Sequence, residues 1–246
     1  MQNYLPVNRS LIPGILTTGN LFCGFLSVKC AFQGEFVTAA WLIILAGIFD
    51  GLDGTVARIT KSYSKFGVEL DSFADVVSFG LAPAVLIYAW HFNELGILGI
   101  AISFLPLMFG AFRLARFNVG FSRFDEKENF IGLPIPVQAV SLASYLIFCE
   151  TIWSRVRFPM FLVPFVVLLC LLMVSQIEYE TYPKFRLRGD RKNKAKFIIF
   201  IIFFTLVVLY PKVAFFPICL AFVLFGLIKG AFHHLHDEDE VIDLPV

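Results

Sequence analysis

The stretch FDGLDGTVARITKSYSKFGVELDSFADVVSFG, residues 49–80, places four carboxylates inside a chain that is otherwise strongly apolar. Asp50 and Asp53 are three residues apart, and Asp71 and Asp75 are four residues apart. On a helix, residues at these spacings lie on one face, with Cβ atoms ~5–6 Å apart. The short connection at 59–66 predicts two antiparallel neighbouring helices, so that all four carboxylates meet.

Four clustered carboxylates repel one another, and removing them from water in an apolar setting is costly. A hard divalent cation offsets both effects, because Mg²⁺ and Mn²⁺ prefer oxygen ligands and Mg²⁺ usually contacts substrate phosphates as well. We therefore interpret four residues as metal ligands: Asp50, Asp53, Asp71 and Asp75. The alternative is an ion-paired helix end at the membrane boundary.

Small and basic residues within the same stretch extend this interpretation. Gly54, Ala57 and Gly67 leave room for a bulky ligand to approach the backbone. Arg58 and Lys61 lie beside the carboxylates in the sequence and can hold phosphate oxygens. The pattern indicates transfer of a phosphorus-centred group in a metal site at the membrane surface.

The composition is that of a polytopic membrane protein. Hydrophobic residues make up 58% of the chain, charged residues make up 16%, and the mean hydropathy is +0.79. Soluble domains carry about 25% charged residues. The five cysteines lie in or beside apolar runs without metal-ligand spacing, so we interpret them as buried apolar side chains. The sequence has no nucleic-acid-binding pattern.

Apolar runs of at least ~17 residues are candidate membrane spans. Eight candidates are present, of which the seventh is short, at about 12–32, 37–58, 67–91, 95–117, 134–151, 158–177, 196–211 and 213–232. The sequence thus predicts an all-α, polytopic integral membrane bundle of about eight transmembrane helices, forming one domain over residues 1–246. Within this domain we expect a catalytic core at about 10–178, a basic loop at 178–196, a C-terminal helix pair at 196–232 and an acidic tail at 233–246.

The distribution of positive charge predicts the orientation in the membrane. With eight spans both termini lie on one side, and 16 of the 20 lysines and arginines fall in segments on that side. Cytoplasmic segments of membrane proteins carry the excess of Lys and Arg. We therefore expect both termini and the carboxylate site at the cytoplasmic face of the cell's inner membrane.

Polar residues in other spans are further candidates. Thr17 and Asn20 lie three residues apart in an apolar run, and they either hydrogen-bond to another helix or line the site. Arg113 and Arg116 share one helix face near the cytoplasmic side, where arginines also mark the bilayer edge. Pro83 is expected to kink or locally break the third span.

The central stretch resembles the signature of the CDP-alcohol phosphotransferase family at every position: Asp50-x-x-Asp53-Gly54-x-x-Ala57-Arg58-x8-Gly67-x3-Asp71-x3-Asp75. This resemblance implies one or two Mg²⁺ or Mn²⁺ ions, a cytidine nucleotide lined by the small residues, and a homodimer formed through membrane helices. The family often shows P-N-x-L-T-x-x-N in its first span. Here Gly14 replaces the usual Asn, and Thr17 and Asn20 carry over as candidates for binding the nucleotide or its phosphates.

Two further stretches, DSFADVVSFGLAPA at 71–84 and FRLARFN at 112–118, resemble the bacterial and archaeal phosphatidylserine synthases of that family. The resemblance covers roughly residues 10–140. It implies CDP-diacylglycerol and L-serine as substrates, membrane lipids as the surroundings, and Asp75 as the general base. The residues that become candidates to hold the acceptor or the lipid phosphate are Ser78, Arg113 and Arg116.

Two alternatives remain open on the sequence alone. The acceptor could be glycerol 3-phosphate, inositol phosphate or choline, and a phosphorylated acceptor would need the basic cluster that Arg113 and Arg116 can supply. A protein of a different class, a cation transporter, would place carboxylates along a transmembrane path. Here the carboxylates gather near one face, among glycines and an arginine. Metal-dependent release of CMP separates the enzyme from the transporter.

Overall fold

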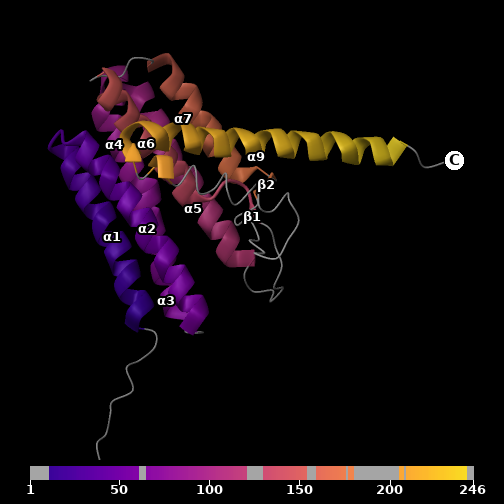
Figure 1. Cartoon of the computed structure of the whole chain (residues 1–246), viewed down its shortest axis with the longest axis horizontal. Helices are drawn as coiled ribbons and strands as arrows, with labels where there is room; N and C mark the ends of the chain where they lie inside the picture. Colours follow the sequence, from indigo (N-terminus) through magenta and orange to yellow (C-terminus); the bar gives the residue numbers. More distant parts are fainter. Residues whose placement is uncertain are drawn as a thin grey trace, which may run out of the picture.

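The computed structural model describes residues 11–60, 65–120, 130–153, 159–175, 177–179, 205–207 and 209–242. These residues form a bundle of helices (Figure 1). The strands found among them, β1 (Phe130–Ile131) and β2 (Glu178–Tyr179), are two residues long and pair antiparallel. The predicted all-α class is thus confirmed.

The long helices follow the chain in a simple order. Their bounds are α1 (Leu11–Phe32), α2 (Phe36–Thr60), α3 (Lys65–Asp75), α4 (Ala82–Trp90), α5 (Ile97–Gly120), α6 (Ile135–Trp153), α7 (Pro159–Val174) and α9 (Pro211–Ile242). A π-helical segment, Val76–Leu81, joins α3 to α4, and a 3₁₀ turn, Phe92–Leu95, follows α4. Because α3, the π segment and α4 run without a break, they form one membrane span.

Six helical stretches in the described part of the chain are long and apolar enough to cross a membrane, so the chain is an integral membrane protein. They correspond to the first five predicted spans and to the last. The predicted span at 158–177 is the shorter apolar helix α7, of 16 residues. The predicted span at 196–211 lies mostly outside the described residues. The last span continues as helix to Ile242, so α9 includes ten residues of the predicted acidic tail.

The helix α6 lies at the centre of the bundle and packs against α2, α9 and the π segment. Its residues are apolar almost all round, as expected for a helix without a solvent face. On one side Tyr145 holds α9, because its ring lies 5.1 Å from that of Phe216 between centroids. From this contact α9 crosses the bundle at a steep angle and projects beyond it (Figure 1).

The π segment is how the chain accommodates Pro83, which was expected to kink the third span. Proline has no N–H to donate to the carbonyl four residues earlier, so one backbone hydrogen bond of a regular α-helix is lost there. The backbone widens one turn ahead of the proline, and the N–H of Ala82 donates to the carbonyl of Val77, five residues back. Single π turns of this kind often occur at functional sites. This one begins directly after Asp75.

Gly24 lets α1 approach the π segment closely. A Cβ added at Gly24 would lie 2.8 Å from the Cα of Ser78, a backbone contact that could not be relieved by turning a side chain. The Ser78 hydroxyl donates to the carbonyl of Asn20, one turn away on α1, at 2.9 Å. The contact therefore fixes the position of α1 against the helix that carries the second carboxylate pair.

We expect Gly24→Ala to destabilise the protein, because its methyl group would force α1 away from Ser78. Overpacking of this kind typically costs about 1–3 kcal/mol. The measurement is the midpoint of thermal unfolding in detergent. Gly14→Ala on the same helix is the matched control, since a Cβ there would meet nothing within 4 Å. Equal midpoints for the two variants would contradict the close contact.

Candidate metal and phosphate site

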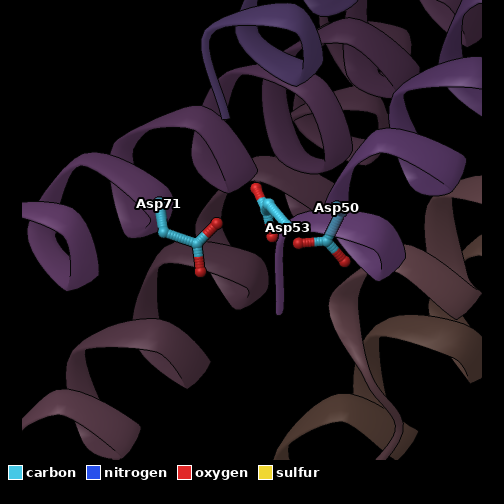
Figure 2. Close-up of side chains that lie close together, drawn as sticks. All are labelled: Asp50, Asp53 and Asp71. Atoms are coloured by element: carbon cyan, nitrogen blue, oxygen red, sulfur yellow. The ribbon is translucent and has the colours of Figure 1, made fainter. Parts of the chain in front are cut away.

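Three carboxylates converge between α2 and α3. Asp50 and Asp53 lie near the C-terminal end of α2, and Asp71 lies in the middle of α3. Each offers an oxygen that lies within 4.8 Å of the oxygens offered by the other two. Figure 2 shows the three side chains pointing toward one another from their two helices. The structure thus brings together the two halves of the motif as their helical spacing predicts.

Asp75 adjoins this cluster one turn deeper in the membrane span. Its side chain is buried, and its charge interacts with those of Asp50 and Asp71. The amide nitrogen of Asn20 donates to Asp75 Oδ1 at 3.3 Å. All four carboxylates of the motif therefore lie in one region, with Asp75 at its buried end.

The first helix contributes to the site directly. Thr17 Oγ1 donates to Asp53 Oδ2 at 2.9 Å, and this hydrogen bond is buried. One turn later Asn20 reaches Asp75. The sequence left open whether this polar stripe joins helices or lines the site. In the structure its two members hydrogen-bond to the carboxylates themselves, so the stripe serves both purposes.

The donor set fits a hard divalent cation. Asp71 Oδ1 is buried and has no hydrogen-bond partner among the described residues. In the same part of the chain, the one ion pair within 4.0 Å joins His91 and Glu94, at the far end of the third span. Among the described residues, the clustered carboxylates therefore have no cationic side chain within 4.0 Å. An all-oxygen set of this kind is what Mg²⁺ and Mn²⁺ prefer.

The predicted phosphate-binding and nucleotide-binding residues lie beside the cluster on α2 and α3. Arg58 is exposed, and its Nε donates to the carbonyl of Gly54 at 3.0 Å. A Cβ added at Gly54 would come near only the Arg58 head, at 3.9 Å, so this face of α2 is open. Ala57 and Gly67 are partly buried. Lys61 lies outside the described residues.

The structure separates the two arginines of α5. Arg113 is buried, and its charge lies close enough to interact with that of Asp75. Arg116 is exposed and donates to the carbonyl of Val174, at the end of α7, at 3.4 Å. Ser78 is fully buried against α1. Of these three predicted residues, Arg113 is therefore the buried one whose charge interacts with a carboxylate of the site.

Sequence reasoning missed two polar features of the bundle, the first of them beside the site. Asn118 Nδ2 donates to Ser72 Oγ at 3.1 Å, which ties the end of α5 to α3 between Asp71 and Asp75. Gln138 on α6 is fully buried, and neither of its amide atoms has a partner among the described residues. A glutamine inside the apolar run at 135–149 is the signal that could have found the second feature.

Apolar spanning helices thus gather a group of carboxylates that could hold a divalent cation. The model of the CDP-alcohol phosphatidyltransferase family matches residues 10–175, and the chain belongs to this family.

Curated relatives extend this match over most of the chain. The chain is 38% identical over 235 residues to the CDP-diacylglycerol–serine O-phosphatidyltransferase of Helicobacter pylori, covering 93% of this chain and 94% of that protein. It is 37% identical over 219 residues to the protein of the same name from Methanocaldococcus jannaschii, with coverage of 89% and 93%. The archaetidylserine synthase of Methanothermobacter thermautotrophicus is 38% identical over 172 residues, with coverage of 68% and 69%.

Proposed function

We propose that this protein is a phosphatidylserine synthase. It transfers the phosphatidyl group of CDP-diacylglycerol to the hydroxyl of L-serine and releases CMP. The observation that carries the proposal is the convergence of Asp50, Asp53, Asp71 and Asp75. It occurs in a chain that matches, over nearly their full length, relatives bearing the name of this reaction.

The carboxylates and the basic residues have separate roles in binding CDP-diacylglycerol. Mg²⁺ or Mn²⁺ held by Asp50, Asp53, Asp71 and Asp75 would neutralise charge on the pyrophosphate and ease the departure of CMP. Arg58 and Lys61 hold phosphate oxygens. The open face at Gly54, with Ala57 and Gly67, admits the cytidine. Thr17 orients Asp53 through its buried hydrogen bond.

Asp75 handles the proton of the acceptor. Its carboxylate accepts the proton from the serine hydroxyl as the serine oxygen forms a bond to the lipid-side phosphorus. The bond between that phosphorus and the oxygen of CMP breaks, and CMP carries away the electron pair. The proton then passes from Asp75 to solvent. Attack in line with the departing CMP requires a fixed position for serine, so much of the rate arises from positioning.

The membrane supplies one substrate and fixes the orientation. The acyl chains of CDP-diacylglycerol lie in the cytoplasmic leaflet, and its nucleotide enters the site from the cytoplasm. The charge distribution supports this placement, since 16 of 20 lysines and arginines lie in the segments assigned to that side. The exposed apolar residues of the spans face lipid or the second subunit of a homodimer.

The orientation predicts the behaviour of reporters fused to the C-terminus in a bacterial host. We expect a fluorescent protein that folds in the cytoplasm to be bright, because α9 would end on that side. A phosphatase that is active only outside the inner membrane should be silent in the same position. The opposite pattern would contradict the orientation and would move the site to the outer face.

The test of the function uses purified protein in detergent micelles with CDP-diacylglycerol and Mg²⁺ or Mn²⁺. CMP release is followed with serine, glycerol 3-phosphate, inositol phosphate and choline in turn. We expect release with serine alone, lost on chelation. Release with another acceptor would leave the family assignment standing but would show that serine is not the acceptor. If folded protein released no CMP with any acceptor, the proposed enzyme activity would be wrong and the cation transporter would be favoured.

A further inference from the structure

Two buried polar atoms beside Asp75 have no partner among the described residues. One is the acceptor Oδ1 of Asn20, on α1, and the other is the donor Nε of Arg113, on α5. Both side chains are nine-tenths or more buried, with 0% of Asn20 and 8% of Arg113 exposed. Leaving buried polar groups unpaired is costly, so such groups call for a specific explanation.

The orientation of Asn20 follows from its neighbour. A carboxylate can only accept hydrogen bonds, so Asn20 turns its amide nitrogen toward Asp75. The carbonyl oxygen of the side chain is then left as a buried acceptor with no donor in the part of the chain that the structure describes. The backbone at this position is held as well, because the Ser78 hydroxyl donates to the Asn20 carbonyl and Gly24 seats α1 against the π segment.

Arg113 lies near Asp75 but does not form an ion pair in contact with it. The two charges are close enough to interact, yet the described part of the chain contains no ion pair between them within 4.0 Å. A buried guanidinium that lacks a carboxylate in contact is poised for an anion from elsewhere. The planar guanidinium matches a carboxylate or a phosphate in two-point hydrogen bonding.

We propose that Arg113 and Asn20 form a receptor for an amino-acid acceptor: Arg113 binds its carboxylate, and the Asn20 carbonyl accepts from its ammonium group. The inference rests on the proposed function and deepens it. Asn20 hydrogen-bonds to Asp75, and the charge of Arg113 interacts with that of Asp75, so an acceptor held at its two charged groups presents its hydroxyl to the general base. Each orphaned atom then gains the partner that it lacks.

The arrangement explains preference for serine over other alcohols. An acceptor without the carboxylate leaves Arg113 Nε buried without a partner among the described residues, and one without the ammonium does the same to Asn20 Oδ1. Because such groups would be left unpaired, a site that hydrogen-bonds a substrate group discriminates strongly against analogues that lack that group. A phosphorylated acceptor satisfies the arginine but brings no ammonium group to Asn20 Oδ1. Arg113 and Asn20 are therefore specificity-determining residues.

The experiment compares serine with two analogues in the full-length protein in micelles. Ethanolamine is serine without the carboxylate, and 3-hydroxypropionate is serine without the ammonium group. In the unaltered protein we expect kcat/KM for CMP release to fall about 100-fold or more for each analogue. In Arg113→Gln the advantage of serine over ethanolamine should shrink at least tenfold, while that over 3-hydroxypropionate persists. Asn20→Leu should show the converse.

Each ratio comes from one protein preparation, so it does not depend on the fraction of folded enzyme. Arg113→Lys should restore part of the preference over ethanolamine. Lys29→Gln, which removes a positive charge from the opposite end of α1, should leave both ratios within about twofold. Unchanged ratios in Arg113→Gln and Asn20→Leu, with serine-dependent release intact, would overturn this inference alone. The absence of serine-dependent release from the unaltered protein would overturn the proposed function and the inference with it.

Discussion

Asp75→Asn is expected to lower kcat for serine-dependent CMP release by about 10³-fold, with little change in folding. Loss of a general base costs about 10²–10⁴ in rate, and this residue is also one of the four proposed metal ligands. Asparagine is nearly isosteric with aspartate, and its Oδ1 can still accept from Asn20. The measurement is kcat at saturating serine, together with the thermal midpoint in detergent.

Glu69→Gln is the matched control for this substitution. Glu69 lies on the same helix as Asp71, but its side chain is exposed. Removing its charge tests whether any carboxylate on α3 matters. We expect kcat to stay within about twofold of the unaltered protein, the small change usual for surface substitutions. If Asp75→Asn kept more than a tenth of the rate, or if Glu69→Gln fell equally far, the assignment of the base would be wrong.

Removal of divalent cations is expected to abolish CMP release, and Mg²⁺ or Mn²⁺ should restore it. The reason is that the clustered oxygens of Asp50, Asp53 and Asp71 have no protein cation in contact within the described residues. Full activity in the presence of excess chelator would contradict a metal role for the cluster. Restoration by added metal distinguishes this result from irreversible unfolding.

Thr17→Val gives a finer test of the same cluster. Valine keeps the shape of the side chain but removes the hydroxyl that donates to Asp53. Loss of a partner that orients a metal ligand typically costs about 10–100-fold in metal affinity or activity. We expect the metal concentration for half-maximal activity to rise by about this factor, with kcat largely recovered at saturating metal. An unchanged metal requirement would show that Asp53 needs no support from α1.

The sequence was sufficient to predict the helical bundle and the convergence of the carboxylates. Helical periodicity fixes which side of α2 carries Asp50 and Asp53, and the short connection forces α3 to run back beside it. The length and apolarity of the spans fix the class of protein. These features depend on residues that are close together in the chain, so they can be predicted from a single sequence.

Other parts of the site depend on contacts between distant helices. The pairing of Asn20 with Asp75, 55 residues apart, requires the close approach at Gly24. The hydrogen bond from Asn118 to Ser72 likewise joins helices far apart in the chain. Pro83 predicted an interruption of the third span. That the interruption is a π turn starting after Asp75 depends on the packing of α1 and α5 around this segment. The different environments of Arg113 and Arg116 are also set by that packing.

The most direct test of the account follows isotopically labelled serine into lipid. Purified protein in micelles receives CDP-diacylglycerol, the labelled serine and Mg²⁺ or Mn²⁺, and lipid and nucleotide products are measured together. We predict one labelled phosphatidylserine for each CMP released, with neither product formed after chelation. CMP that appears without label in the lipid would contradict transfer to serine, which is the central claim.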